Sequence, residues 1–256
     1  MSQTQADTAG ARLLVITGGS RGIGRAIAIE AAHAGWQVVV GSRSPLPFDE
    51  ADAAGAGIHA FELDVCDPSS QTSFFARVHR ELGCPNALVN SAGIDRGAIA
   101  IEDLAHADVQ SMFAVNAVGL IESCHQFVRL AARSRGGQGG TIVNISSMAS
   151  TIGGRRHKTV YAATKAAVDA FTVGAAKELA GEGIRVFSVR PGVTRTDMTA
   201  ELLSDAQRRD AIRATIACGR EAEVGQIAAP VIELLSERFA YASGSMINLA
   251  GGGFIL

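Results

Sequence analysis

Short runs of apolar, mostly β-branched residues alternate along the chain with longer segments of helical periodicity. Nearly pure apolar runs are typical of strands that are covered on both faces of a sheet. We predict such strands at 13–16, 37–40, 58–61, 86–89, 141–145, 184–189 and 245–249. The segments between them predict helices over 22–34, 69–82, 103–134, 161–180 and 223–236. The alternation therefore predicts an α/β fold, a single Rossmann-type doubly wound parallel sheet of about seven strands with helices on both faces.

The organisation along the chain favours one domain. No proline-rich linker or internal repeat divides the 256 residues, a length that can bury a substantial core. We expect a polar, disordered tail at 1–10, followed by a single domain over 11–256. The segment 44–57, which holds two prolines and is rich in alanine, leaves room only for a shortened or irregular helix.

Composition and charge exclude several classes of protein. The chain has 25 acidic and 23 basic residues, and a net charge of −2 argues against a nucleic-acid partner. The apolar run at 13–16 is too short to span a membrane. Neither the four cysteines nor the six histidines show metal-ligand spacing, so we expect no metal. These features predict a cytoplasmic protein with a small-molecule partner, no nucleic acid and no membrane.

A glycine-rich segment directly follows the first predicted strand. Residues 17–24 read Thr-Gly-Gly-Ser-Arg-Gly-Ile-Gly and lead straight into a predicted helix. Glycines allow a tight turn, and the N–H groups of the helix N-terminus can bind a phosphate. The spacing differs from Gly-x-Gly-x-x-Gly, and a mere connecting turn is the alternative. In its strand–loop–helix context, the segment favours a dinucleotide site.

The end of the second strand indicates which dinucleotide binds. An acidic side chain there binds the ribose hydroxyl of NAD, whereas a basic one accommodates the phosphate of NADP. Here Ser42 and Arg43 follow the strand without a carboxylate, and Arg21 lies in the glycine-rich segment. These residues favour NADP, although both arginines could simply be solvated. Asp64 and Val65, after the third strand, are placed for an adenine contact.

A tyrosine and a lysine share one face of a predicted helix. Tyr161 and Lys165 are four positions apart, and Tyr161 is one of only two tyrosines in the chain. To act as an acid or base near neutrality, a tyrosine must lower its pKa by roughly 3 units from about 10, and a nearby cation acts in that direction. A surface pair is the alternative. Ser147, at the end of the fifth strand, lies at the sheet edge where ligands bind.

These motifs occur in order with others along the chain: TGGSRGIG (17–24), DV (64–65), NSAG (90–93), VN (115–116), NISS (144–147), YAATK (161–165), RPGVTRTDM (190–198) and INLAGGG (247–253). From about Arg12 to Gly253 the sequence resembles the short-chain dehydrogenase/reductase family. It is most similar to the NADP-dependent branch that includes ketoacyl carrier-protein reductases and glucose-dehydrogenase-like enzymes. The resemblance implies an NADP(H)-dependent oxidoreductase that interconverts a carbonyl and a secondary alcohol.

The resemblance also implies catalytic roles for four residues. Tyr161 matches the acid/base, Lys165 the residue that lowers its pKa and binds the nicotinamide ribose, and Ser147 the hydroxyl that polarises the carbonyl. Asn116 matches the residue whose backbone holds a relay water. The implied cofactor residues, besides Tyr161 and Lys165, are Gly18, Ser20, Arg21, Gly22, Ile23, Gly24, Ser42, Arg43, Asp64, Val65, Asn90, Ala92, Gly93, Pro191, Gly192, Val193, Thr194 and Thr196.

Further expectations concern the surroundings of the site. A basic segment, Arg155 to Lys158, could attract an acidic substrate, a carrier-protein surface or a cofactor phosphate, or it could be a solvated loop. Residues 197–219 are expected to form a mobile lid with a partly apolar pocket. The resemblance implies a homotetramer. The alternatives are a non-catalytic dinucleotide-binding or regulatory protein, an NAD-dependent sugar or alcohol dehydrogenase, and an epimerase or dehydratase, against which the compact length argues.

Overall fold

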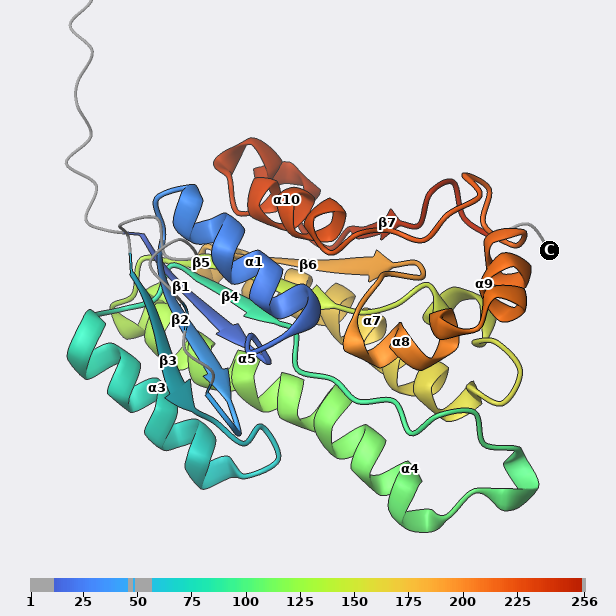
Figure 1. The fold of residues 1–256 in the computed structure, drawn as a ribbon. Coiled ribbons are helices and arrows are strands. Elements are labelled where there is room, and N and C mark those ends of the chain that lie inside the picture. The colour runs from blue at the N-terminus through green and yellow to red at the C-terminus, as the bar shows by residue number, and fades with distance from the viewer. Residues whose placement is uncertain (1–11, 46–47, 49–56, 255–256) are drawn as a thin grey trace, which may run out of the picture.

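The computed structural model describes residues 12–45, 48 and 57–254 (Figure 1). The expected tail at 1–10 and most of the segment 44–57 lie outside them. One sheet of seven parallel strands runs through the chain, as predicted. Its order is β3 (Ile58–Glu62), β2 (Gln37–Ser42), β1 (Leu13–Thr17), β4 (Ala87–Asn90), β5 (Gly140–Ile145), β6 (Ile184–Pro191) and β7 (Met246–Leu249).

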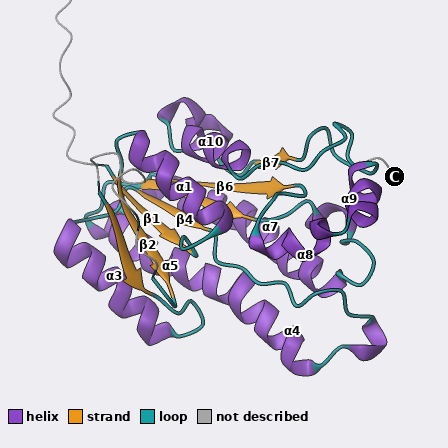
Figure 2. Cartoon of the chain, in the orientation of Figure 1, coloured by secondary structure: helices purple, strands orange, loops and turns teal. Residues whose placement is uncertain are grey.

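Helices cover both faces of the sheet (Figures 1 and 2). One layer consists of α1 (Gly22–His33) and α10 (Gly225–Leu234), and the other of α3 (Pro68–Leu82), α5 (Gly119–Ala131) and α7 (Thr159–Leu179). Successive residues of a strand point to opposite faces. In β1, Leu13 and Val15 therefore join the core beneath α3, α5 and α7, whereas Leu14 and Ile16 join the core beneath α1 and α10.

The expected continuous helix over 103–134 is wrong. The structure divides it into a 3₁₀ turn (Ile101–Asp103), α4 (His106–Phe113), a π-helical turn (Ala114–Val118), α5 and a second 3₁₀ turn (Arg133–Arg135). In the π turn the N–H of Gly119 donates to the carbonyl of Ala114, five residues back. The physical reason lies in the middle of the turn, where the buried Asn116 side chain bonds the backbone of a neighbouring loop. Periodicity cannot reveal such a contact.

Shorter elements complete the chain. They are α6 (Ala149–Ile152), α8 (Asp197–Ser204), α9 (Ala206–Arg213) and 3₁₀ turns at Ala180–Glu182 and Glu237–Ala242. Strand β1 pairs with β2 on one side and with β4 on the other, so the direction of strand addition reverses between β1 and β4. In open parallel sheets, ligands bind at the carboxyl ends of the strands beside such a reversal. The fold therefore directs attention to the residues that follow β1, β4, β5 and β6.

Candidate active site

The glycine-rich loop after β1 lies against the end of β4. Gly18 has a φ of +71°, and a Cβ built on it would lie 2.5 Å from the Cα of Ala92. Gly22 also has a positive φ, of +57°, at the first residue of α1. A residue with a side chain at Gly18 would meet both backbone strain and a steric clash. Glycine thus allows the loop to lie close to the end of β4. Helix α1 begins beside the switch point, which is the place between β1 and β4 where the direction of strand addition reverses.

The N-terminus of α1 is suited to an anion. Arg21 occupies the cap position without a capping hydrogen bond from its side chain, and the first turn of the helix holds no acidic residue. Free N–H groups and the helix dipole attract negative charge at such an end. The exposed guanidinium of Arg21 lies 3.8 Å from the carboxylate of Asp197, at the start of α8. The expected phosphate loop therefore has the geometry and the charge to hold a pyrophosphate.

The end of β2 carries an unsatisfied hydroxyl. Ser42 is buried, and its Oγ has no hydrogen-bond partner among the described residues. Buried polar atoms without a partner are uncommon in native proteins and call for an explanation. Arg43, the next residue, is exposed, and its positive charge opposes the rise in the pKa of the Cys66 thiol beyond β3. A hydroxyl and a guanidinium thus stand where a dinucleotide would place the 2′ position of its ribose.

Asp64 and Val65 follow β3 and have structural contacts of their own. The Asp64 carboxylate accepts a hydrogen bond of 2.9 Å from the N–H of Cys66, and its backbone N–H donates to Ser70. The carbonyl of Val65 accepts from the Gln71 amide at 2.9 Å. Both residues are half-buried at the carboxyl edge of the sheet, and their contact with an adenine stays a prediction.

The three predicted residues at the end of β4 and just after it have separate environments. The buried Asn90 side chain donates to Asn144 Oδ1 at 2.9 Å and to Cys124 Sγ at 3.2 Å, so it braces the strands. Ala92 packs against Gly18. A Cβ at Gly93 would lie 3.6 Å from Lys165 Nζ. Sequence reasoning missed Asn144, whose signal was a polar residue inside an otherwise apolar strand.

Three of the four predicted catalytic residues gather where β5 meets α7. Ser147 follows β5 and is hydrogen-bonded to the Tyr161 side chain. Lys165 lies one turn further along α7, with its Nζ 5.9 Å from the centre of the Tyr161 ring. That Nζ donates a hydrogen bond of 2.8 Å to the carbonyl of Ile145. The cluster thus places a hydroxyl, a phenol and an ammonium at one sheet edge.

Asn116, the fourth predicted catalytic residue, is buried and contacts the helix that carries Tyr161 and Lys165. Its amide accepts from the N–H of Ile94 and donates to the carbonyl of Ile94, both at 2.8 Å. It also donates to Thr164 Oγ1, on α7, at 3.1 Å. Asn116 therefore ties the π turn to the loop after β4 and to the helix that carries Tyr161 and Lys165.

The pKa of Tyr161 is governed chiefly by burial in this structure, and the expected effect of Lys165 on it stays a prediction. Burial raises the pKa of Tyr161 to about 12, the hydrogen bond from Ser147 opposes this rise, and the charge of Asp95 adds to it. Burial lowers the pKa of Lys165 to about 8, against the charge of Asp169. The desolvation of a buried phenolate outweighs the other effects in the protein alone. Tyr161 is consequently a protonated phenol at neutral pH.

The predicted nicotinamide residues lie at the end of β6 and in the hydrogen-bonded loop that follows it. The N–H of Gly192 donates to the carbonyl of Leu249 at 2.9 Å, and the carbonyl of Val193 accepts from Ala222 at 2.9 Å. Pro191 ends β6, and Thr194 donates to the carbonyl of Gly192. The side chain of Thr196 then caps α8. This loop joins the switch point to the expected lid.

The expected lid contains α8 and α9. Leu203, Ile212 and Ile216 are buried there in a small core of their own, to which Val193 and Phe254 add contacts. Two further apolar residues of this segment, Met198 and Leu202, are exposed on α8.

The basic segment between α6 and α7 is not a uniform positive patch. Arg155 donates to Thr215 at 3.2 Å and stacks over Phe254, whereas Lys158 forms an ion pair with Asp95. Only Arg156 is exposed.

Two further observations bear on partners. The described ranges hold no group of three or more His, Cys, Asp or Glu side chains that could bind a metal ion. Within the same ranges, every helix is too short or too polar to cross a bilayer.

Comparisons with known proteins agree with this geometry. The chain is 34% identical over 245 residues to an uncharacterised oxidoreductase of Escherichia coli, YgfF, covering 94% of this chain and 99% of that protein. It is 32% identical to the human 3-oxoacyl-[acyl-carrier-protein] reductase, with coverage of 94% and 97%. The solved structure of ElxO with NADP bound superposes with a TM-score of 0.85 at 25% identity, covering 95% and 98% of the two chains. The family profile described as short chain dehydrogenase matches residues 12–207, and the chain therefore belongs to this family of oxidoreductases, which act on carbonyl or CH–OH groups.

Proposed function

We propose that the protein is an NADP(H)-dependent oxidoreductase that interconverts a carbonyl compound and a secondary alcohol. The observation that carries the proposal is the grouping of Ser147, Tyr161 and Lys165 beside a glycine-rich loop at the sheet switch point. A non-catalytic dinucleotide-binding protein would not require a half-buried phenol and hydroxyl beside the buried Lys165 at that edge.

Each residue of the group has a task that follows from its chemistry. The dinucleotide, when bound, supplies or accepts a hydride at its nicotinamide ring. Tyr161, a protonated phenol at neutral pH, donates its proton to the carbonyl oxygen in reduction and accepts it in oxidation. Ser147 donates a hydrogen bond to the same oxygen and orients the substrate. Lys165 lies at the ring of Tyr161 and returns a proton to it from solvent. Asn116 holds the helix of both residues in place through its hydrogen bond to Thr164.

NADP rather than NAD is proposed on two features of the site. The hydroxyl of Ser42 is buried and unsatisfied, so it fits an additional acceptor, and Arg43 and Arg21 supply cations nearby. The similarity to ElxO, solved with NADP, supports the same choice. The test compares kcat/KM for NADPH and NADH in the wild type and in Arg43→Ala. We expect the variant to lose NADPH preference by at least tenfold while NADH is unaffected; a wild-type preference for NADH would refute the proposal.

Tyr161→Phe tests the catalytic proposal itself. The variant removes one hydroxyl and keeps the ring, so NADPH should still bind, as fluorescence titration can show. Turnover should fall at least 10³-fold in an NADPH-oxidation screen over uncharged ketones, keto esters and sugars, because the proton donor is lost. Tyr241→Phe is the matched control, since that ring is fully exposed on the late 3₁₀ turn. Retained turnover in Tyr161→Phe would exclude the mechanism.

The remaining expectations stand as proposals on the same site. We propose that 197–219 closes over the substrate and that the chain forms a cytoplasmic homotetramer. The exposed apolar side chains of Val118 and Ile121, at the start of α5, offer surface for self-association. Light scattering of the purified protein tests the assembly, and a monomeric mass would refute it.

A further inference from the structure

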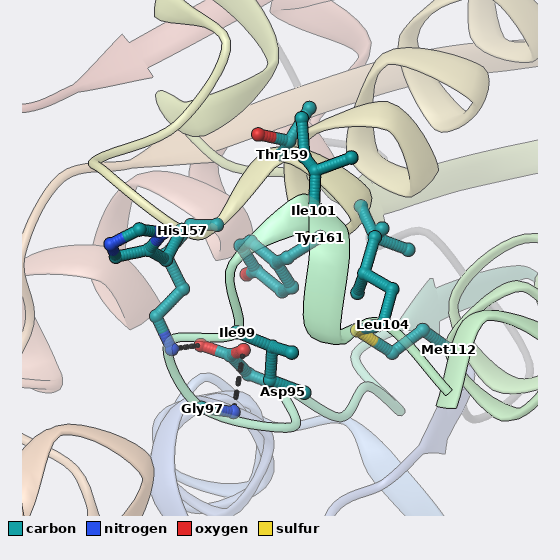
Figure 3. Close-up of a pocket in the computed structure, with 11 residues that line it drawn as sticks. Asp95, Gly97, Ile99, Ile101, Leu104, Met112, His157, Thr159 and Tyr161 are labelled. Carbon is teal, nitrogen blue, oxygen red and sulfur yellow. Dashed lines mark hydrogen bonds and ion pairs between the residues drawn. The ribbon is translucent and has the colours of Figure 1, made fainter. Parts of the chain in front are cut away.

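A small cavity of about 10 Å³ opens beside Tyr161 (Figure 3). Its wall combines apolar side chains of the loop after β4 and of α4 with a pair of opposite charges. The Nζ of Lys158 lies 2.6 Å from Asp95 Oδ2, and the two side chains are 27% and 16% exposed. The pair therefore lies largely out of water on the same cavity wall as the phenol, where charges are weakly screened.

Backbone contacts hold this pair in place. Asp95 Oδ1 accepts from the N–H of Gly97 at 3.2 Å, as Figure 3 shows. The carbonyl of His157 accepts from the N–H of Ile99 at 2.9 Å. His157 has a φ of +66°, the only positive value of a non-glycine residue in the described ranges. Strained backbone of this kind is often found at functional sites. The two loops that flank Tyr161 are thus joined by one ion pair and one backbone hydrogen bond.

The other charged groups around Tyr161 have different partners. Lys165, on the same helix, donates to the carbonyl of Ile145. Arg96, the neighbour of Asp95, contacts Ser111 and Asp108 on α4. Arg155, in the same loop as Lys158, bonds Thr215 beyond α9. His157 lines the cavity, and its backbone carbonyl accepts the hydrogen bond from Ile99. Neutralisation of the Asp95 carboxylate consequently falls to Lys158.

We infer that Lys158 is a positioning residue that acts on the reaction through Asp95: it neutralises the carboxylate beside Tyr161, so that the phenol can lose its proton before alcohol oxidation and the phenolate can accept the proton of the alcohol. The inference rests on the proposed acid/base role of Tyr161. An anion near a phenol opposes formation of the phenolate. The charge of Asp95 indeed raises the pKa of Tyr161. This effect is present while the ion pair is formed, and removal of the Lys158 ammonium, 2.6 Å away, would leave the carboxylate charge unpaired.

The experiment measures the pH dependence of kcat/KM for oxidation of an uncharged secondary alcohol at saturating NADP⁺. Cyclohexanol, 2-butanol and 1-phenylethanol are the probes, and the best of them is used for all variants. Lys158→Met should move the acidic limb of the profile upward by about one pH unit, which is about a tenfold loss below the limb. Lys158→Arg keeps the charge and should restore the wild-type profile. Asp95→Asn/Lys158→Met removes both charges and should return the limb to or below its wild-type position.

Arg156→Met is the matched control. It removes the same charge from the same loop, but Arg156 is exposed, and the ion pair of Asp95 is with Lys158. Its limb should stay within about 0.2 pH units of wild type, as expected for a screened surface charge. Equal shifts in Arg156→Met and Lys158→Met, or no shift in Lys158→Met, would overturn the inference, as would a shift that persists in the double variant.

Two measurements keep the test decisive. Should Lys158→Met fail to fold by circular dichroism, Asp95→Asn alone must lower the limb, because it removes the opposing anion without leaving one unpaired. Should none of the probes be oxidised, absorbance at 295 nm follows Tyr161 directly, since Tyr241 is the only other tyrosine and Tyr161→Phe isolates its signal. Failure of the inference leaves Tyr161→Phe inactive, whereas failure of the proposed function leaves Tyr161→Phe active.

Discussion

Replacing Gly18 by alanine probes the turn that brings the dinucleotide loop against β4. The φ of +71° is unfavourable for any residue with a Cβ. The added methyl carbon would also lie 2.5 Å from Ala92 Cα, 2.6 Å from Ala92 N and 2.9 Å from the carbonyl carbon of Ser91. All three neighbours are backbone atoms, so the clash cannot be relieved by rotating a side chain. Either β4 or the loop must move.

The cost follows from these two terms. A left-handed backbone costs about 1–2 kcal/mol for alanine, and overpacking against a rigid neighbour costs about 1–3 kcal/mol. Their sum predicts a fall in the free energy of unfolding of about 2–5 kcal/mol. For a chain of this size, each kcal/mol lowers Tm by about 2–4 °C, so Tm should fall by about 4–20 °C.

Gly35→Ala provides the control for backbone strain alone. Gly35 has a φ of +80°, but no atom lies within 4 Å of a Cβ built there. It should therefore cost only about 1–2 kcal/mol. Differential scanning calorimetry and urea unfolding measure the Tm and the free energy of unfolding of both variants. Titration with NADPH measures whether the glycine-rich loop still binds the dinucleotide. Equal destabilisation of the two variants would refute the packing argument, because it would show that β4 yields to the methyl group at no cost.

Three further predictions address buried charges and thiols. Glu221→Gln weakens the carboxylate contacts to two arginines and should lower the free energy of unfolding by about 1.5–3 kcal/mol, measured in urea at pH 7. Because the pKa of Glu221 in the folded protein is depressed to about 2, this stabilisation is complete above about pH 4.5 and fades as the pH falls toward 2. An unchanged difference between variant and wild type at pH 3 would refute the prediction. Asp169→Asn removes the anion that raises the pKa of Lys165, so the alkaline limb of the pH profile of kcat/KM should move to lower pH. An alkaline limb at the wild-type pH would contradict this prediction. Cys124, buried and with its pKa raised to about 12, should resist thiol reagents that label the exposed Cys218 in the native protein, as peptide mapping can check.

The sequence by itself determined the architecture and predicted which side chains gather at the candidate site. Apolar runs bounded by turns located every strand of the sheet to within a few residues, because strands covered on both faces admit few polar side chains. The spacing of Tyr161 and Lys165 specified one helix face, since residues four apart are neighbours on any α-helix. The choice of Tyr161 over Tyr241 followed from the same local pattern. Strand patterns and helix faces depend on residues that are close together in the sequence, so the sequence alone can specify them.

Tertiary structure decided everything that depends on contacts between distant segments. The π turn at Asn116 exists because its amide bonds a loop more than twenty positions earlier. The raised pKa of Tyr161 and the unsatisfied hydroxyl of Ser42 result from burial, which is set by the whole fold. The basic loop, uniform in sequence, is divided by its partners, and Lys158 is neutralised by Asp95 across the site. Electrostatics and hydrogen bonding depend on distance in space, and only the folded chain defines those distances.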